Sequence, residues 1–246
     1  MTPLHDVTLV VTSCGRPDLL FRTLDSLERE EPYPFAARII IEDSADRATV
    51  EAIRSRYPGD TVLFNDPQIG QMRSIDRAYA RVRTPYVFHC EDDWAFEGGP
   101  FVDRAIGVLE ADVGVSVVCV RRLEEIADKF LQTPPRRTVA GTDVVKIDPA
   151  AHPEWFGYGF NPGLARMETY RAHGPFEPFG TEAAISVHFK GLGFTTAYLT
   201  PGHARHIGGD AHVDDPFQPK RPTGLASRLR HSFVKRAGRL RRRIGH

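Results

Sequence analysis

Cysteine is scarce in this sequence, and its spacing argues against a disulfide framework. Cys14, Cys90 and Cys119 are far apart, and no CxxC pair occurs. Each lies in or at the end of an apolar run, where a reduced thiol packs as a small hydrophobic side chain. An odd set of cysteines without a motif is typical of a reducing compartment. We therefore expect a cytoplasmic protein.

Long apolar runs are also lacking. No stretch approaches the ~18 uncharged apolar residues that a membrane-spanning helix needs. The first apolar run covers only residues 7–11, and no basic region precedes it, so we expect no signal peptide. The 246 residues, of which 41% are apolar and 26% charged, are typical of a soluble globular protein with a buried core.

Acidic residues are absent after Asp215. The whole chain holds 32 basic and 32 acidic residues, yet residues 216–246 contain ten Lys and Arg and neither Asp nor Glu. The first 215 residues therefore carry a net charge of −10. On this basis we predict two parts, an acidic body over 1–215 and a basic tail over 216–246.

Apolar residues recur in the tail at intervals of four or three positions. They are Leu225, Leu229, Phe233, Ala237, Leu240 and Ile244. One narrow apolar stripe on a basic helix is typical of a helix that lies on an anionic membrane. We therefore expect residues 225–246 to hold the protein at the inner face of the membrane. Nucleic acid is a poorer partner, because base-stacking aromatics are missing and the body is acidic. A disordered tail, or a helix packed on a partner, is the remaining alternative.

Short β-branched runs alternate with longer helical patterns in the body. Strands are expected at 7–13, 37–43, 61–66, 85–91, 114–122 and 195–200, and helices at 16–30, 45–57, 70–82, 101–111 and 181–194. This alternation predicts an α/β fold with a mainly parallel sheet and helices on both of its faces. Residues 123–160 are expected to form a loop-rich insertion, and 201–224 a loop rich in Gly, Pro and His.

Polar residues follow four of the predicted strands. These clusters are Thr12-Ser13, Glu42-Asp43-Ser44, Asn65-Asp66 and Glu91-Asp92-Asp93. In open parallel sheets, ligands bind beyond the carboxyl ends of the strands. We therefore expect the four clusters to converge on one site.

The triplet Glu91-Asp92-Asp93 carries the clearest chemistry. Adjacent carboxylates repel one another unless a cation offsets their charge. Carboxylate oxygens are hard ligands that bind Mg²⁺ or Mn²⁺ together with substrate phosphates. A solvated acidic loop is the alternative, but a triplet that ends a buried strand favours a metal site.

The segments "VTLVVTSCGRPDLLFRTLDSL", "IIIEDSAD" and "GQMRSIDRAYARVRTPYVFHCEDDW", in this order, resemble the successive signatures of family-two-like glycosyltransferases of the GT-A fold. The resemblance implies a single GT-A-like (Rossmann-like) domain. It also implies an enzyme that moves a sugar from a nucleotide diphosphate sugar to an acceptor, with inversion, in surface polysaccharide or glycolipid synthesis.

The same resemblance implies a metal site. Asp93 is expected to be the principal ligand of Mn²⁺ or Mg²⁺, and His206 from a C-terminal loop is expected to complete the site. The family's Asp-x-Asp is Glu-Asp-Asp here, so Glu91 or Asp92 would face the ribose or a metal-bound water. Which carboxylates contact the metal stays open at this point.

For the donor, the resemblance implies a nucleoside pocket after the first two strands. The residues expected to contact the donor there are Thr12, Ser13, Arg16 and Asp43, with Arg73 and Asn161 nearby. Asp43 has the alternative of capping the following helix, and Arg73 that of a surface arginine on an amphipathic helix.

Glu182 matches the acidic motif at the start of a late helix in this family. The resemblance implies that it is the catalytic base, which deprotonates the acceptor hydroxyl. A first-turn glutamate that the helix dipole favours is the alternative. A nucleotidyltransferase on a related sheet, or a non-catalytic nucleotide-sugar-binding module, are the rival functions for the whole protein.

Overall fold

The computed structural model of this chain describes residues 6–126, 137–209, 213 and 216–217. The chain divides into two compact units, Met1–Val213 and Asp214–His246, and the description below concerns the first. The predicted basic helix over 225–246 lies outside the described residues. No helix among the described residues is long and apolar enough to cross a membrane.

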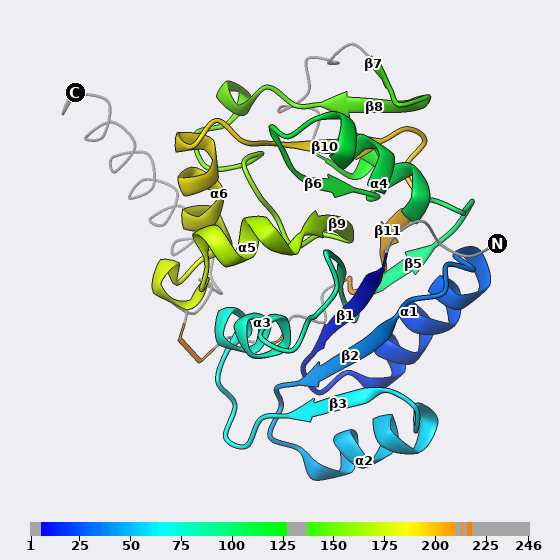
Figure 1. The fold of residues 1–246 in the computed structure, drawn as a ribbon. Helices are drawn as coiled ribbons and strands as arrows, with labels where there is room; N and C mark the ends of the chain where they lie inside the picture. The colour runs from blue at the N-terminus through cyan, green and yellow to red at the C-terminus, as the bar shows by residue number, and fades with distance from the viewer. Residues whose placement is uncertain (1–5, 127–136, 210–212, 214–215, 218–246) are drawn as a thin grey trace. The chain divides into compact units, whose positions relative to one another are not determined.

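A nine-stranded mixed sheet organises the described part of the first unit (Figure 1). Its order is β3-β2-β1-β4-β9-β6-β10-β8-β7. The strands are β1 Val7–Ser13, β2 Ala37–Glu42, β3 Thr61–Phe64, β4 Tyr86–Glu91, β6 Val115–Cys119, β7 Arg137–Val139, β8 Thr142–Lys146, β9 Gly163–Arg166 and β10 Thr195–Leu199. Strands β3, β2, β1 and β4 pair in parallel, as do β6 and β10. Strand β9 runs antiparallel between β4 and β6, and β8 and β7 form an antiparallel edge.

Helices cover both faces of this sheet. They are α1 Pro17–Glu30, α2 Arg47–Arg56, α3 Gln71–Tyr79, α4 Val102–Ala111, α5 Met167–His173 and α6 Glu182–Gly191, with short 3-10 turns η1 Leu123–Glu125, η3 Pro149–Ala151 and η4 Glu177–Phe179. One hydrophobic cluster joins one face to α1, α2 and α4, and a second joins the other face to α3, α5 and α6. In β1, Leu9 and Val11 belong to the first cluster and Val10 to the second, as the alternation of side chains along a strand requires. The predicted α/β fold class is therefore confirmed.

The structure differs from the sequence prediction in two segments expected to be loops. Residues 137–146 form the β7–β8 hairpin, which joins the main sheet through β10. Residues 204–206 form β11 (Ala204–His206), which pairs antiparallel with β5 (Trp94–Phe96). Strands β5, β7 and β11 have three residues each, which is too few alternations to produce a periodic signal, so only the contacts with distant partners reveal them.

His89 on β4 makes the stability of the fold depend on pH. Both of its ring nitrogens are buried without a hydrogen-bond partner, between the rings of Tyr79 and Phe160. Burial lowers the pKa of His89 from 6.5 to about 3. In the unfolded chain His89 is protonated near pH 6.5, whereas in the folded chain it stays neutral down to about pH 3. The free energy of unfolding therefore falls as pH falls through this window.

We expect His89→Leu to remove this loss. Urea unfolding of the wild type and the variant at pH 7.5, 6 and 5 measures it. The difference between the two free energies of unfolding should change by up to about 1.4 kcal/mol per pH unit below pH ~6, with the variant relatively more stable in acid. Since other titrating groups cancel in this difference, a difference that is constant with pH would contradict the prediction.

Candidate active site

The polar clusters predicted after the first four strands lie together in the structure. Hydrogen bonds link them across the strand ends: Ser13 Oγ to Asp92 Oδ2 at 3.1 Å, Gly15 N to Glu42 Oε1 at 2.8 Å, and Asn65 Nδ2 to Asp43 Oδ1 at 2.7 Å. Thr12 lies beside Glu91 in the register of β1 and β4, and its side chain is partly exposed. The carboxyl ends of the parallel strands thus form one polar centre.

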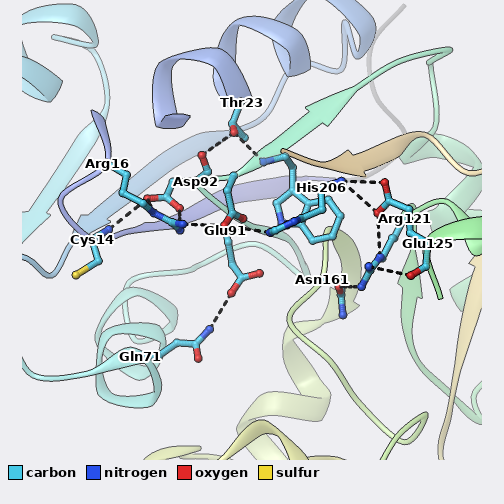
Figure 2. Close-up of polar contacts among 12 residues, drawn as sticks. Cys14, Arg16, Thr23, Gln71, Glu91, Asp92, Arg121, Glu125, Asn161 and His206 are labelled. Carbon is cyan, nitrogen blue, oxygen red and sulfur yellow. Dashed lines mark hydrogen bonds and ion pairs between the residues drawn. The ribbon is translucent and has the colours of Figure 1, made fainter. Parts of the chain in front are cut away.

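Asp92 holds the turn that follows β1. Its carboxylate accepts hydrogen bonds from the backbone N of Cys14 at 3.3 Å and from Arg16, whose guanidinium also pairs with it (Figure 2). Its carbonyl oxygen accepts the Thr23 hydroxyl at 2.8 Å. Burial raises the pKa of Asp92 to about 6, with Arg16 opposing the rise and Asp93 adding to it. Asp92 and Arg16 therefore orient the loop, and most of the Asp92 oxygen capacity is used within the protein.

Asp93 differs from Asp92 because one of its oxygens has no partner. Its Oδ2 lies 2.9 Å from Arg16 Nη1 and 3.2 Å from His206 Nε2. Its Oδ1 is buried and accepts no hydrogen bond. The backbone of Gly208 passes close to this carboxylate: a Cβ added to Gly208 would lie 2.6 Å from Asp93 Oδ2. A buried, unpartnered carboxylate oxygen beside an imidazole fits one side of a divalent-metal site.

His206 reaches Asp93 from β11. Its ring packs edge-on against Trp94 with 5.3 Å between ring centres, and its backbone N donates to the Glu125 carboxylate at 3.1 Å (Figure 2). His203, by contrast, is buried with Nε2 3.0 Å from Arg104 Nη1. His206 is thus the described histidine of this loop that faces the carboxylates.

No group of three His, Cys, Asp or Glu side chains within the described ranges is arranged to hold a metal ion. Asp93 and His206 form a pair, so donor phosphates and water would have to supply the other ligands. Magnesium is commonly bound in this way, through one or two carboxylates and substrate phosphates. The two protein ligands Asp93 and His206 therefore fit a metal ion that binds together with a nucleotide.

Glu91 points toward α3, where Gln71 Nε2 donates to its Oε1 at 3.0 Å (Figure 2). Burial raises the pKa of Glu91 to about 8, and the charges of Asp93, Glu182 and Asp92 add to the rise. At neutral pH this carboxyl group therefore holds a proton unless a cation offsets the neighbouring charges. Glu182, although 91 positions later in sequence, acts on the same centre.

Asp43 is occupied by the loop before α3. Besides Asn65, its carboxylate accepts the backbone N of Ile69 at 2.9 Å and of Gly70 at 2.8 Å. The alternative that Asp43 caps the next helix is wrong, because the Asp46 side chain accepts from the first-turn amides of α2. Asp43 therefore fixes the shape of the loop. A contact with a bound nucleotide sugar would use the remaining lone pair of the Asp43 carboxylate.

Arg73 lies on the exposed side of α3. Its Nε donates to Glu177 Oε1 at 2.7 Å, and both side chains are about half exposed. In the structure Arg73 is therefore a surface arginine on an amphipathic helix, which is the alternative given above.

Glu182 is the first residue of α6 and faces the segment before β9. The Thr181 side chain caps the helix, and the backbone N of Phe160 donates to Glu182 Oε1 at 2.9 Å. A Cβ on Gly159 would lie 3.1 Å from this oxygen, so glycine permits the approach. Burial raises the pKa of Glu182, whereas the Phe160 amide and the charge of Arg121 lower it. Glu182 is thus a partly buried carboxylate at the centre, as a general base requires.

Arg121 is a residue of the site that the sequence analysis missed. It follows β6 and donates to Asn161 Oδ1 at 3.1 Å (Figure 2), which fixes Asn161 in the site. Its position at the carboxyl end of a predicted strand was the available signal. The adjacent Arg122 carries the same signal but pairs with Glu97 instead, so the sequence alone could not separate the two.

No protein-family model and no curated protein matches this chain. Solved structures are similar at low identity. The mannosyltransferase PcManGT from Pyrobaculum calidifontis, in complex with GDP-Man and Mn²⁺, is 16% identical over 82% of this chain and 56% of its own, with a TM-score of 0.57. TarS 1–349 from S. aureus is 14% identical over 82% and 60%, with a TM-score of 0.57. GalNAc-T7 with UDP, GalNAc and Mn²⁺ is 12% identical over 84% and 44%, with a TM-score of 0.60.

The chain thus spans about half the length of the structures it matches. At this level of identity the likeness concerns the fold, and the proteins it joins are glycosyltransferases of the GT-A type. Together with the sheet order and the helices on both faces, these comparisons show that the chain has a GT-A fold.

Proposed function

We propose that this protein is a metal-dependent glycosyltransferase, which moves a sugar from a nucleotide diphosphate sugar to a saccharide or lipid-linked acceptor. The observation that carries the proposal is Asp93: its Oδ1 is buried without a partner, beside His206 and at the end of a strand that delivers two further carboxylates. The names of similar structures support it, since two were solved with Mn²⁺ and with a nucleotide or nucleotide sugar.

The residues divide the work by position. Asp93 and His206 would hold Mn²⁺ or Mg²⁺, which stabilises the negative charge of a departing diphosphate. Thr12, Ser13 and the loop fixed by Asp43 would border the nucleoside, and Glu91 the ribose. Glu182 would take the proton of the acceptor hydroxyl as it attacks the anomeric carbon from the opposite side, which gives inversion.

A thermal-shift screen tests this function. UDP-, GDP-, CDP- and dTDP-linked sugars are added to the full chain with and without Mn²⁺, and release of the nucleoside diphosphate is then measured for those that stabilise. We expect one base to raise the melting temperature only when the metal is present, because a ligand that binds the folded state stabilises it. Stabilisation by nucleoside triphosphates alone would instead favour a nucleotidyltransferase, and binding without turnover a non-catalytic module.

We propose further that the basic tail brings the enzyme to the cytoplasmic face of a membrane that carries its acceptor, in surface polysaccharide or glycolipid synthesis. The support is the sequence alone, namely the apolar stripe and the unbroken positive charge of 225–246.

Deletion of residues 225–246 should release the protein from anionic vesicles. Each basic residue near such a surface contributes about 1 kcal/mol of attraction, so the full chain should sediment with phosphatidylserine vesicles at 0.1 M salt and the truncated chain should not. Turnover with a soluble acceptor should stay the same. Neutral phosphatidylcholine vesicles are the control, and equal sedimentation of both chains with the anionic vesicles would contradict the role of the tail.

A further inference from the structure

Arg121 is held on several sides at the edge of the proposed centre (Figure 2). Its Nη1 donates to Asn161 Oδ1 at 3.1 Å, its Nε to Glu125 Oε2 at 3.3 Å, and its Nη2 to the Glu125 carbonyl at 3.3 Å. Its Cζ lies 5.3 Å from the ring centre of Trp94, within range of a cation–π interaction. These contacts fix the planar guanidinium in one orientation.

On one side the contacts lead to His206. Glu125 accepts the backbone N of His206 on both carboxylate oxygens, each at 3.1 Å. The Trp94 indole, which has Arg121 over its face, also has the His206 imidazole against it. Arg121 therefore supports both the backbone and the ring of His206 through these two partners.

On the other side they lead to Glu182. Asn161 follows Phe160, whose backbone N donates to Glu182 Oε1. A Cβ on Gly159 would lie 3.1 Å from that oxygen and 3.6 Å from Asn161 Nδ2, so the two side chains border the same small space. Arg121 thus fixes a neighbour of the proposed base.

Charge adds to this geometry. Five titratable groups interact electrostatically with Glu182. They are Glu91 on β4, Cys119 on β6, Arg121 after β6, Tyr158 before β9 and Tyr198 on β10. Of these described groups, Arg121 is the one with a positive charge. Because burial raises the pKa of Glu182 and Arg121 lowers it, loss of Arg121 would make the carboxylate harder to form.

We propose that Arg121 is a positioning residue for the transfer reaction: it joins Glu182 and Asn161 on the base side to His206 on the metal side, and its positive charge acts on the Glu182 carboxyl group. This inference rests on the proposed function, because it assigns Arg121 to the same reaction.

The test compares Arg121→Gln and Arg121→Lys with the wild type. Hydrolysis of the donor found in the screen, in which water replaces the acceptor and the nucleoside diphosphate is released, is measured with Mn²⁺ from pH 5.5 to 9. For Arg121→Gln we expect kcat at pH 7 to fall about tenfold to a hundredfold, the acid limb of the kcat profile to move to higher pH, and the donor KM to change by less than about twofold. For Arg121→Lys the acid limb should return toward that of the wild type, because the charge is kept. Its kcat should stay lower, because an ammonium cannot replace the forked contacts.

Arg122→Gln is the matched control. Arg122 is the next residue, and its guanidinium pairs with Glu97, half exposed to solvent, so its profile should equal that of the wild type. An acid limb that is the same in Arg121→Gln and the wild type would overturn the inference while leaving the proposed function intact. A wild type that releases no nucleoside diphosphate from any donor would overturn the proposed function itself. If Arg121→Gln does not fold, Arg121→Lys decides: a wild-type kcat in that variant overturns the inference.

Discussion

Asp93→Asn should abolish metal-dependent donor binding and strongly reduce turnover while leaving the protein folded. Asn keeps the shape of the side chain but removes the charge and one of the two acceptor oxygens. The orphaned Oδ1 and the Oδ2 beside His206 are the atoms that this change affects. Arg16 keeps its pairing with Asp92, so the loop after β1 should retain its anchor.

The expected loss of activity in Asp93→Asn follows from the proposed role of Asp93 as a metal ligand. A pair of protein ligands leaves no replacement when one is lost, so we expect kcat to fall about a thousandfold, equal to about 4 kcal/mol of transition-state stabilisation. Calorimetry should show that the nucleoside diphosphate no longer binds more tightly when Mn²⁺ is added. Circular dichroism and the melting temperature check that the fold is intact.

Asp25→Asn is the control for this change of charge. Asp25 is half exposed and pairs with Arg56 on the surface, with Nη2 to Oδ1 at 2.6 Å, so activity should not change. Two results would show that Asp93 is no metal ligand: Mn²⁺-dependent binding that survives in Asp93→Asn, or full wild-type turnover in excess EDTA.

Local patterns were enough to predict the half of the fold that carries the proposed nucleotide pocket. The first four strands and their helices are regular, and each strand of this group ends in polar residues. The rule that ligands bind at the carboxyl edge of a parallel sheet therefore predicted that Ser13, Asp43 and Asp92 lie in one place. Hydrogen bonds among these clusters confirm the convergence. The individual roles could not be predicted, because they depend on which donors surround each carboxylate.

The second half of the site is assembled by contacts across long sequence separations. Arg121 and Asn161 are 40 positions apart, and Glu125 and His206 are 81 apart. Neither pair leaves a periodic pattern, and β11, which carries His206, has three residues. His206 could still be predicted through the family resemblance, whereas Arg121 could be distinguished from Arg122 only by seeing where each guanidinium lies.

Glu182→Gln should lose turnover and keep the donor. The glutamine carbonyl can still accept the Phe160 amide, which Glu182 Oε1 accepts at 2.9 Å, so the segment before β9 should keep its place. What is lost is the capacity to take a proton from the acceptor. Removal of a general base costs about a hundredfold to ten-thousandfold in rate, and we expect kcat to fall within that range.

Calorimetric affinity for the nucleoside diphosphate with Mn²⁺ should change by less than about twofold, since the proposed metal ligands, Asp93 and His206, do not include Glu182. Glu168→Gln separates catalysis from the effect of a charge at a helix start. Glu168 also lies in the first turn of its helix, α5, and is exposed, so it gains the same favourable interaction with a helix dipole without facing the site. If Glu182 is the base, only its variant loses turnover. Equal, small effects of the two substitutions would instead mean that Glu182 serves its helix and that another group removes the proton.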